Sequence, residues 1–340
     1  MTRTPQPMEL KQQSFQESSR DCRVMMATID SCRGNKKLHT SVGISTGLVL
    51  SGGGARGAYQ IGCWRAFLDR KLTFSAVAGS SIGALNGALI CQGSWDSAHK
   101  LWLSLTRLTI LGLDFRRLVK LAAVAVGDLG LLLMPIPDVR FLRALKYTSS
   151  LLKIASRHGS LGALRMHGLI NIKKFEPLLR RFINMRKIQL QPAALLFTVC
   201  KNPRATNPFG EPDWFRVQDQ SEEDAWNILA ASMSVPFVFS AIELHGDQYS
   251  DGGIGQWLPI EPLYRNGVRR MVIVSTKANT SYDPARYPGC AFTLIQPPKP
   301  LGRFPVATFR FTERAVLGWM EQGYQDAIRV LERDEAFLGN

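Results

Sequence analysis

The residues best suited to chemistry lie in a short segment, Gly79-Ser80-Ser81-Ile82-Gly83, that places a serine between two glycines. In this Gly-x-Ser-x-Gly pattern the serine sits on a sharp turn between a strand and a helix, and the glycines leave room for the backbone to pass. A serine hydroxyl held in this way attacks an ester carbonyl once a base accepts its proton. Ser81 is therefore the candidate nucleophile. Ordinary glycine-rich turns show the same pattern, so the case depends on the rest of the chain.

A glycine-rich loop upstream, Gly52-Gly53-Gly54-Ala55-Arg56-Gly57, could supply donors for an oxyanion. It lies between an apolar segment that predicts a strand, 47–50, and a segment with helical spacing, 59–68. Free N–H groups and a helix N-terminus favour an anion at such a loop. If strand 47–50 and the next predicted strand, 76–78, are parallel neighbours, their carboxyl ends lie side by side. The Ser81 hydroxyl would then face the N–H groups of Gly52, Gly53 and Gly54.

Two nucleotide-binding interpretations of this loop fit less well. Gly52, Gly54 and Gly57 match the dinucleotide pattern G-x-G-x-x-G, which needs an acidic residue at the end of the second strand to bind a ribose. Here that strand ends in Gly79-Ser80-Ser81. A Walker loop needs Gly-Lys-Ser/Thr, which does not follow the glycines. The sequence therefore favours an oxyanion loop, and we expect no cofactor.

Positive charge is concentrated in one internal segment. The 340 residues include 42 Lys and Arg against 27 Asp and Glu, a net charge of +15. Residues 107–187 hold 16 of the basic and 4 of the acidic residues, so +12 of that charge lies here. A basic segment favours anionic partners. Its basic residues alternate with aliphatic ones and few aromatic side chains are available to stack on bases, so we expect no nucleic-acid partner.

This basic segment supports two readings, which the sequence leaves open. Around residues 141–157 and again around 173–182, leucines, isoleucines and phenylalanines alternate with lysines and arginines. One reading is that residues 107–190 form a helical cap whose apolar face packs on the sheet and whose charges are solvated. The other is peripheral contact with an anionic membrane, because basic amphipathic helices are typical of lipid interfaces.

The cysteines and the apolar segments predict a reduced protein without a membrane span. The six cysteines have no C-x-x-C pair and no metal-ligand spacing, so we expect free thiols and no metal site. Residues 1–40 contain no apolar signal-peptide region, and the longest apolar stretch, 118–134, is short and contains Lys120 and Asp128. We expect a cytoplasmic protein or a peripheral membrane protein.

Two regions of different character follow from the order of elements. Residues 1–44 are polar, with mixed charge and little periodicity, which predicts a disordered N-terminal extension. From there to residue 335, predicted strands alternate with helices, and this alternation indicates an α/β fold with a mainly parallel sheet. The later predicted elements are strands 194–200 and 271–275 and a final amphipathic helix, 311–331.

With these turns in this order, the sequence resembles the patatin-like phospholipase family. Residues 52–57 are similar to that family's oxyanion loop, including its arginine, and residues 79–83 are similar to its nucleophile elbow. Asp251-Gly252-Gly253 is similar to the motif that holds its catalytic aspartate. Three motifs in this order are much more specific than any one of them.

Two further segments support the resemblance, residues 231–236 before the aspartate and residues 323–327 near the end. The resemblance covers roughly residues 47–331 and is weakest between about 107 and 190. It implies a three-layer α/β/α lipid acyl hydrolase domain over residues 45–335, with the basic segment as a cap or insertion.

The resemblance also implies roles for the site residues. Ser81 and Asp251 would form a dyad in which the carboxylate accepts the serine proton and later activates water. Gly52, Gly53 and Gly54 would hold the oxyanion. Arg56 would either steady that loop or contact a phosphate group. The implied substrate is a phospholipid or lysophospholipid, and the chemistry requires no metal.

Three alternatives remain at this stage. A Ser–acid–His triad would need one of the histidines that follow Ser81, each of which is expected at the surface: His99, His158, His167 and His245. A catalytically silent membrane-binding or regulatory module could keep the fold. A neutral-lipid lipase or an acyltransferase could use the same chemistry.

Overall fold

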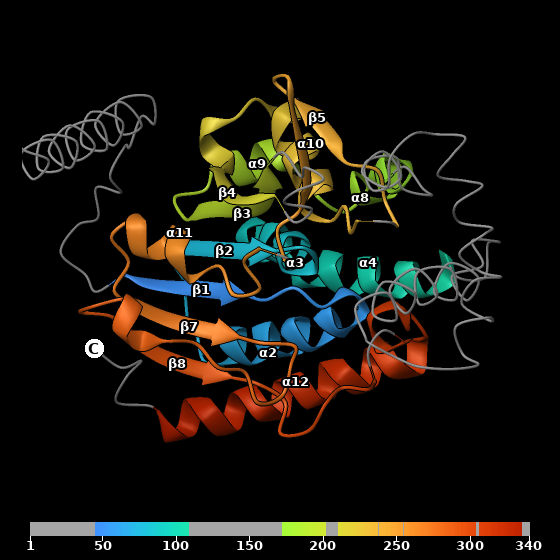
Figure 1. Ribbon diagram of the computed structural model, residues 1–340. Helices are drawn as coiled ribbons and strands as arrows, with labels where there is room; N and C mark the ends of the chain where they lie inside the picture. Colours follow the sequence, from blue (N-terminus) through green and yellow to red (C-terminus); the bar gives the residue numbers. More distant parts are fainter. Residues whose placement is uncertain are drawn as a thin grey trace, which may run out of the picture. The chain divides into compact units, whose positions relative to one another are not determined.

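The computed structural model describes residues 45–108, 172–201, 210–236, 238–253, 255–303 and 306–334. The expected extension 1–44 and most of the expected cap, residues 109–171, lie outside these ranges. The described residues form a mixed eight-stranded sheet with helices around it (Figure 1). The predicted α/β fold with its mainly parallel sheet is confirmed.

Five parallel strands make the centre of the sheet, in the order β3-β2-β1-β7-β8. Strands β1, β2, β3 and β7 are buried along most of their length, which explains why the sequence shows them as short continuous apolar runs, whereas the edge strand β8 is only partly buried. The predicted neighbours β1 and β2 are parallel and adjacent, with Leu50 opposite Gly79. The bounds are β1 Thr46–Leu50, β2 Ala76–Ser80, β3 Ala194–Lys201, β7 Arg270–Val274 and β8 Ala291–Ile295.

Three antiparallel strands extend the sheet beyond β3. Strand β4 (Glu211–Arg216) and strand β6 (Asp247–Asp251) both pair with β3, and β5 (Ile242–Leu244) pairs with β6. A two-residue turn, His245-Gly246, joins β5 to β6, and both residues have positive φ as a tight hairpin turn requires. The pairing of β6 with β3 places Asp251 opposite Val199.

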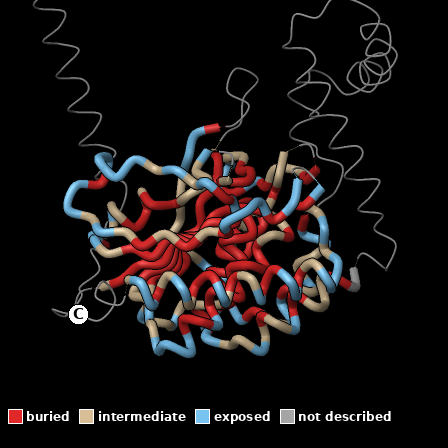
Figure 2. Tube along the Cα trace, turned by 90° about the horizontal axis from the view of Figure 1, so that it is seen from below, coloured by how far each residue is buried: buried red, intermediate tan, exposed pale blue. Residues whose placement is uncertain are grey.

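Helices cover the two faces of the sheet unequally. Leu48, Leu50 and Val272 point into the large core formed with α2 (Ala58–Asp69), α3 (Ile82–Gln92), α4 (Trp95–Leu108) and α12 (Glu313–Arg333). On the other face, the Gly47 position lies against Leu263 of α11 (Ile260–Arg265) and against Val268. Figure 2 shows the buried strands in the middle and exposed residues on the outer sides of the helices.

Helices α2 and α12 run side by side (Figure 1) and touch through two glycines. A Cβ on Gly62 would overlap the Met320 carbonyl oxygen, and a Cβ on Gly323 would overlap the Tyr59 carbonyl oxygen. Between the helices, the buried Asp326 accepts a hydrogen bond of 3.1 Å from the Tyr59 hydroxyl. The motif at residues 323–327 therefore holds α12 against α2.

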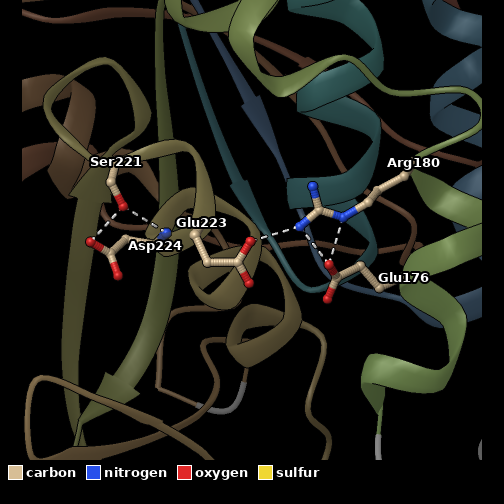
Figure 3. Close-up of polar contacts among 5 residues, drawn as sticks. All are labelled: Glu176, Arg180, Ser221, Glu223 and Asp224. Atoms are coloured by element: carbon tan, nitrogen blue, oxygen red, sulfur yellow. Dashed lines mark hydrogen bonds and ion pairs between the residues drawn. The ribbon is translucent and has the colours of Figure 1, made fainter.

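The described end of the basic segment packs on the core. It contains α8 (Glu176–Leu179) and α9 (Met185–Gln189), and Leu179 and Ile183 are buried there. Arg180 pairs with Glu176 at 2.6 Å and with Glu223 at 2.9 Å (Figure 3). Glu223 belongs to α10 (Glu222–Ser232), whose N-cap Ser221 accepts from the Asp224 N–H (Figure 3). In residues 172–190 most apolar side chains are thus buried or half-buried against the protein, whereas Leu190 is exposed.

Short 3-10 turns complete the described elements: η1 Gly54–Gly57, η2 Ile172–Phe175, η3 Val217–Asp219, η4 Pro284–Arg286 and η5 Val306–Phe309. Among the described helices, none combines the length and the apolar character that crossing a bilayer demands.

Candidate active site

Ser81 occupies a strained turn between β2 and α3. Its φ of 55° and ψ of −123° are uncommon for a residue with a side chain and mark stored backbone strain. The flanking glycines are required by space, because a Cβ on Gly79 would overlap the Gly83 carbonyl and a Cβ on Gly83 would overlap the Leu50 carbonyl. The strand, turn and helix predicted from the sequence are present, and Ser81 stands at the carboxyl edge of the sheet.

The Ser81 hydroxyl meets Asp251, the last residue of β6. Ser81 Oγ donates a hydrogen bond of 2.7 Å to Asp251 Oδ2, and the Gly253 N–H donates one of 2.6 Å to Asp251 Oδ1. Both oxygens of the carboxylate are therefore directed by named donors. Ser81 retains 9% of its surface exposed, whereas Asp251 retains 3%, so the hydroxyl is the more accessible of the pair.

The Asp251 carboxyl is tuned toward neutral pH. Burial raises its pKa from 3.8 to about 6, since removing the carboxylate from water disfavours its charged form. The hydrogen bonds from Ser81 and Gly253 act in the opposite direction because they stabilise the charged form. A carboxylate with a pKa near 6 is ionised at neutral pH and is a better proton acceptor than an ordinary aspartate.

Ser232, the last residue of α10, and the turn that follows it connect Ser81 with Asp251. The Ser232 hydroxyl accepts a hydrogen bond of 3.0 Å from the Ser81 N–H, and the Ser234 carbonyl accepts one of 3.0 Å from the Asp251 N–H. Helix α10 ends at Ser232. Leaving the helix there frees the Ser234 carbonyl to hold Asp251. The family resemblance includes residues 231–236 but implies no role for them.

The glycine loop approaches Ser81 as expected, but its first N–H is occupied. The Gly52 position lies 3.6 Å from Ser81 Cβ, measured from an ideal Cβ on the glycine. The Gly52 N–H donates to the Trp257 carbonyl at 3.4 Å. Within the described ranges, the N–H groups of Gly53 and Gly54 have no backbone acceptor. These two donors are the ones left for an oxyanion.

Arg56 makes the contacts of a residue that supports this loop. Its Nε donates to the Gly53 carbonyl at 3.2 Å, and its Nη2 donates to Thr308 Oγ1 at 3.3 Å. Burial lowers the pKa of the Arg56 guanidinium from its ordinary value. Thr308, in η5, also lies against Gly54, where a Cβ would overlap its carbonyl oxygen.

Three further residues hold the loop and carry no motif that would have found them. Thr276 donates from its hydroxyl to the Gly52 carbonyl at 2.6 Å. Gln60 donates to the Ser51 carbonyl at 2.8 Å and accepts from Asn86 at 2.8 Å. Thr276, Gln60 and Asn86 are all fully buried. The Asn86 side-chain oxygen accepts a hydrogen bond of 3.0 Å from the Trp102 indole N–H.

The described histidines stand elsewhere. The His245 side chain is 68% exposed, and its Nε2 lies 3.6 Å from the Asp224 carboxylate. The His99 ring stacks on Trp95, with ring centroids 4.9 Å apart. His158 and His167 lie outside the described residues. The Ser81 hydrogen bond is made to Asp251 directly.

A search for groups of three or more His, Cys, Asp or Glu able to hold a metal ion found none in the described part of the chain. Within the described ranges four cysteines are free, and three of them are buried: Cys63, Cys91 and Cys200. Burial raises the pKa of the Cys200 thiol to about 11, so it is protonated at neutral pH.

Comparison of the sequence with curated proteins finds relatives that match a short part of this chain. "Neuropathy target esterase sws" of Drosophila persimilis is 55% identical over 50 residues, as is the protein of the same name in Drosophila melanogaster. In each case the match covers 15% of this chain and 4% of the relative, so the chain spans a small part of these curated relatives.

Among solved structures, VipD from Legionella pneumophila aligns at a TM-score of 0.39 and 16% identity, over 86% of this chain and 68% of that one. The ExoU–SpcU complex of Pseudomonas aeruginosa aligns at 0.43 and 16%, over 87% and 52%.

The match to a protein family covers more of the chain than the matches to these curated relatives. The patatin-like phospholipase family matches residues 48–264, more than half of the chain. This range begins in β1, includes the glycine loop and the elbow, and ends in α11 beyond Asp251. The chain therefore belongs to the patatin-like phospholipase family, a family of lipid hydrolases.

Proposed function

We propose that the protein hydrolyses fatty-acyl esters of phospholipids or lysophospholipids through a Ser81–Asp251 dyad. The observation that carries the proposal is the 2.7 Å hydrogen bond from the Ser81 hydroxyl to a buried carboxylate with a pKa of about 6. The proposal is supported by family membership and by the name esterase that the curated relatives bear.

In the first half-reaction, Ser81 Oγ attacks the ester carbonyl carbon while its proton passes to Asp251 Oδ2. The carbonyl oxygen becomes an oxyanion, and we assign its donors to the N–H groups of Gly53 and Gly54. The tetrahedral intermediate then collapses. The alkoxide leaving group takes the proton from Asp251, and the acyl group stays on Ser81 as an ester.

The second half-reaction uses the same groups in reverse. Asp251 accepts a proton from water as the water oxygen attacks the acyl-enzyme carbonyl. The second tetrahedral intermediate collapses with return of that proton to Ser81 Oγ, and the fatty acid leaves. The chain's own residues supply the nucleophile, the base and the oxyanion donors for both steps.

We further propose that residues 45–335 act as one hydrolase domain and that the basic segment 107–190 brings it to anionic membrane as a peripheral protein. The charge of residues 107–187 supports this, and so does the packing of residues 172–190, the described end of the segment, on the core.

The test is fatty-acid release from phosphatidylcholine vesicles, with and without 30% phosphatidylserine, with lysophosphatidylcholine and triolein alongside. We expect the wild type to release fatty acid from phospholipid or lysophospholipid and Ser81→Ala to release none. Release only from triolein would favour a neutral-lipid lipase, and acyl transfer to an added alcohol would favour an acyltransferase. Equal release by Ser81→Ala, or no release from any lipid, would refute the proposal.

A further inference from the structure

We infer that Thr276 is a positioning residue that turns the Gly53 N–H toward the site of the developing oxyanion. This inference rests on the proposed function and adds to it a residue outside the matched range 48–264 and outside every motif of the sequence. It follows from a hydrogen bond, from the planarity of the peptide and from the order of the strands.

The hydrogen bond fixes one carbonyl of the loop. Thr276 Oγ1 donates to the Gly52 carbonyl oxygen at 2.6 Å, and Ser51 Oγ donates to the same oxygen at 3.0 Å. The Thr276 N–H in turn donates to Ser51 Oγ at 2.9 Å, so the two hydroxyls are themselves held in place. Ser51 and Thr276 are fully buried, and water does not compete for these bonds.

Because the peptide between Gly52 and Gly53 is planar, fixing the direction of its carbonyl also fixes the direction of its N–H. The Gly52 carbonyl and the Gly53 N–H belong to the same planar trans unit, in which the two groups point in opposite directions. A carbonyl directed at Thr276 therefore directs the Gly53 N–H away from Thr276. A carbonyl that accepts two hydrogen bonds also makes the N–H of its peptide a stronger donor.

The order of the strands determines what lies on that opposite side. Strand β1, which leads into the loop, has β7 on one side and β2 on the other. Thr276 follows β7, and Ser81 follows β2. An N–H directed away from Thr276 is thus directed toward the edge of the sheet where Ser81 stands and where a bound ester carbonyl would lie.

The close contact between Thr276 and Gly53 leaves no room for a side chain at position 53. A Cβ on Gly53 would overlap Thr276 Oγ1 and would lie 3.0 Å from its Cβ. The loop can therefore pass Thr276 only as a glycine, and the side chain packs directly on the peptide that it orients. This contact does not depend on the identity of the lipid.

The experiment compares Thr276→Val with Thr276→Ser in the full-length chain. Valine keeps the shape of threonine and removes the hydroxyl, whereas serine keeps the hydroxyl. A matched control is Thr293→Val on β8, where an equally buried threonine hydroxyl donates to Asp334 instead. The kinetic constants are measured with p-nitrophenyl butyrate, which needs no membrane.

We expect Thr276→Val to lower kcat about 10- to 100-fold, up to the effect of losing one oxyanion donor, with KM changed less than about twofold. Thr276→Ser and Thr293→Val should keep kcat within about threefold of the wild type. The Ki of an alkyl trifluoromethyl ketone, whose adduct carries an oxyanion, should rise with Thr276→Val by the same factor as kcat/KM falls. The pH midpoint of kcat/KM should stay in place, since Asp251 is unchanged.

A Thr276→Val variant that keeps its kcat, or that loses activity through KM alone, would overturn the inference. If valine prevents folding, the comparison of Thr276→Ala with Thr276→Ser decides in the same way. These outcomes count only while the wild type is active and Ser81→Ala is inactive. If that condition fails, it is the proposed function that is wrong, and the two failures are distinguishable.

Discussion

The Ser81 hydroxyl donates a hydrogen bond of 2.7 Å to the carboxylate of Asp251, which lies 170 positions later in the chain. The fold brings them together because β2 and β6 both end beside β3, one parallel to it and one antiparallel. The serine is strained and the aspartate is buried. The Ser81 N–H donates to the Ser232 hydroxyl at the end of α10, and the Asp251 N–H donates to the Ser234 carbonyl just beyond it. These features lead to separate predictions.

The pH dependence of activity should follow the Asp251 carboxyl. Its protonated form, which dominates below a pKa of about 6, cannot accept the Ser81 proton. We therefore expect kcat/KM to rise with pH through about 6 and to level off above it. A pH series with p-nitrophenyl butyrate measures this. Activity that stays constant from pH 4 to pH 8 would show that Asp251 is not the base.

The ionised Asp251 carboxylate should also lower the free energy of unfolding, because it is buried. Burial raises its pKa from 3.8 to about 6, so the folded state holds a proton that the unfolded state releases. The penalty is absent below pH 3.8 and complete above about pH 6, where it amounts to roughly 2–3 kcal/mol. Asp251→Asn should therefore abolish activity and raise the free energy of unfolding at pH 8 by an amount of this order. Urea denaturation at pH 8 and at pH 3.5 checks both the gain and its disappearance at low pH.

The opposite sign would contradict that account. An Asp251→Asn protein less stable than the wild type at pH 8 would mean that the ionised carboxylate stabilises the fold through its bonds to Ser81 and Gly253. Burial would then not be the dominant influence on Asp251.

His245 should be dispensable for chemistry. Its side chain is largely exposed and is directed at Asp224, outside the dyad. We expect His245→Ala to keep kcat within about twofold, since replacement of a surface side chain away from the site has small effects. Loss of activity comparable to that of Ser81→Ala, with the protein still folded, would favour a triad.

The glycines between α2 and α12 give a prediction about folding. Gly62→Ala should destabilise the protein by at least about 1–3 kcal/mol, because the added methyl overlaps the Met320 carbonyl and forces the helices apart. Gly318→Ala, on the same α12, is the matched control. Nothing lies within 4 Å of its added methyl, and alanine should stabilise the helix by about 0.5–1 kcal/mol. Thermal melting separates the two, and equal shifts would show that the helices do not need close contact.

Much of the site could be predicted from the sequence because its parts are local. The strands β1, β2, β3 and β7 are continuous apolar runs, and the two glycine-rich turns follow directly from two of them. The adjacency of β1 and β2 was also predictable, since consecutive strands joined by a helix usually lie side by side. The structure places the Ser81 hydroxyl against Asp251 and Ser81 Cβ close to Gly52.

The remaining parts depend on contacts between distant segments. The direction of the Gly52 N–H is determined by the Trp257 carbonyl, and the Gly52 carbonyl is held by a threonine 224 positions away. No local pattern distinguishes Thr276 from any other threonine at a strand end. Strand β5 has only three residues, which is too short for the sequence to show the periodicity of a strand.

The central claim is that Ser81 is a nucleophile activated by Asp251, and covalent labelling tests it most directly. The protein is treated with an alkyl fluorophosphonate, and the adduct is located by peptide mass spectrometry. We predict one adduct on the peptide that contains Ser81, none in Ser81→Ala, and labelling slowed at least about 100-fold in Asp251→Asn. Adduct formation at another residue, or labelling of Asp251→Asn at the wild-type rate, would contradict the dyad.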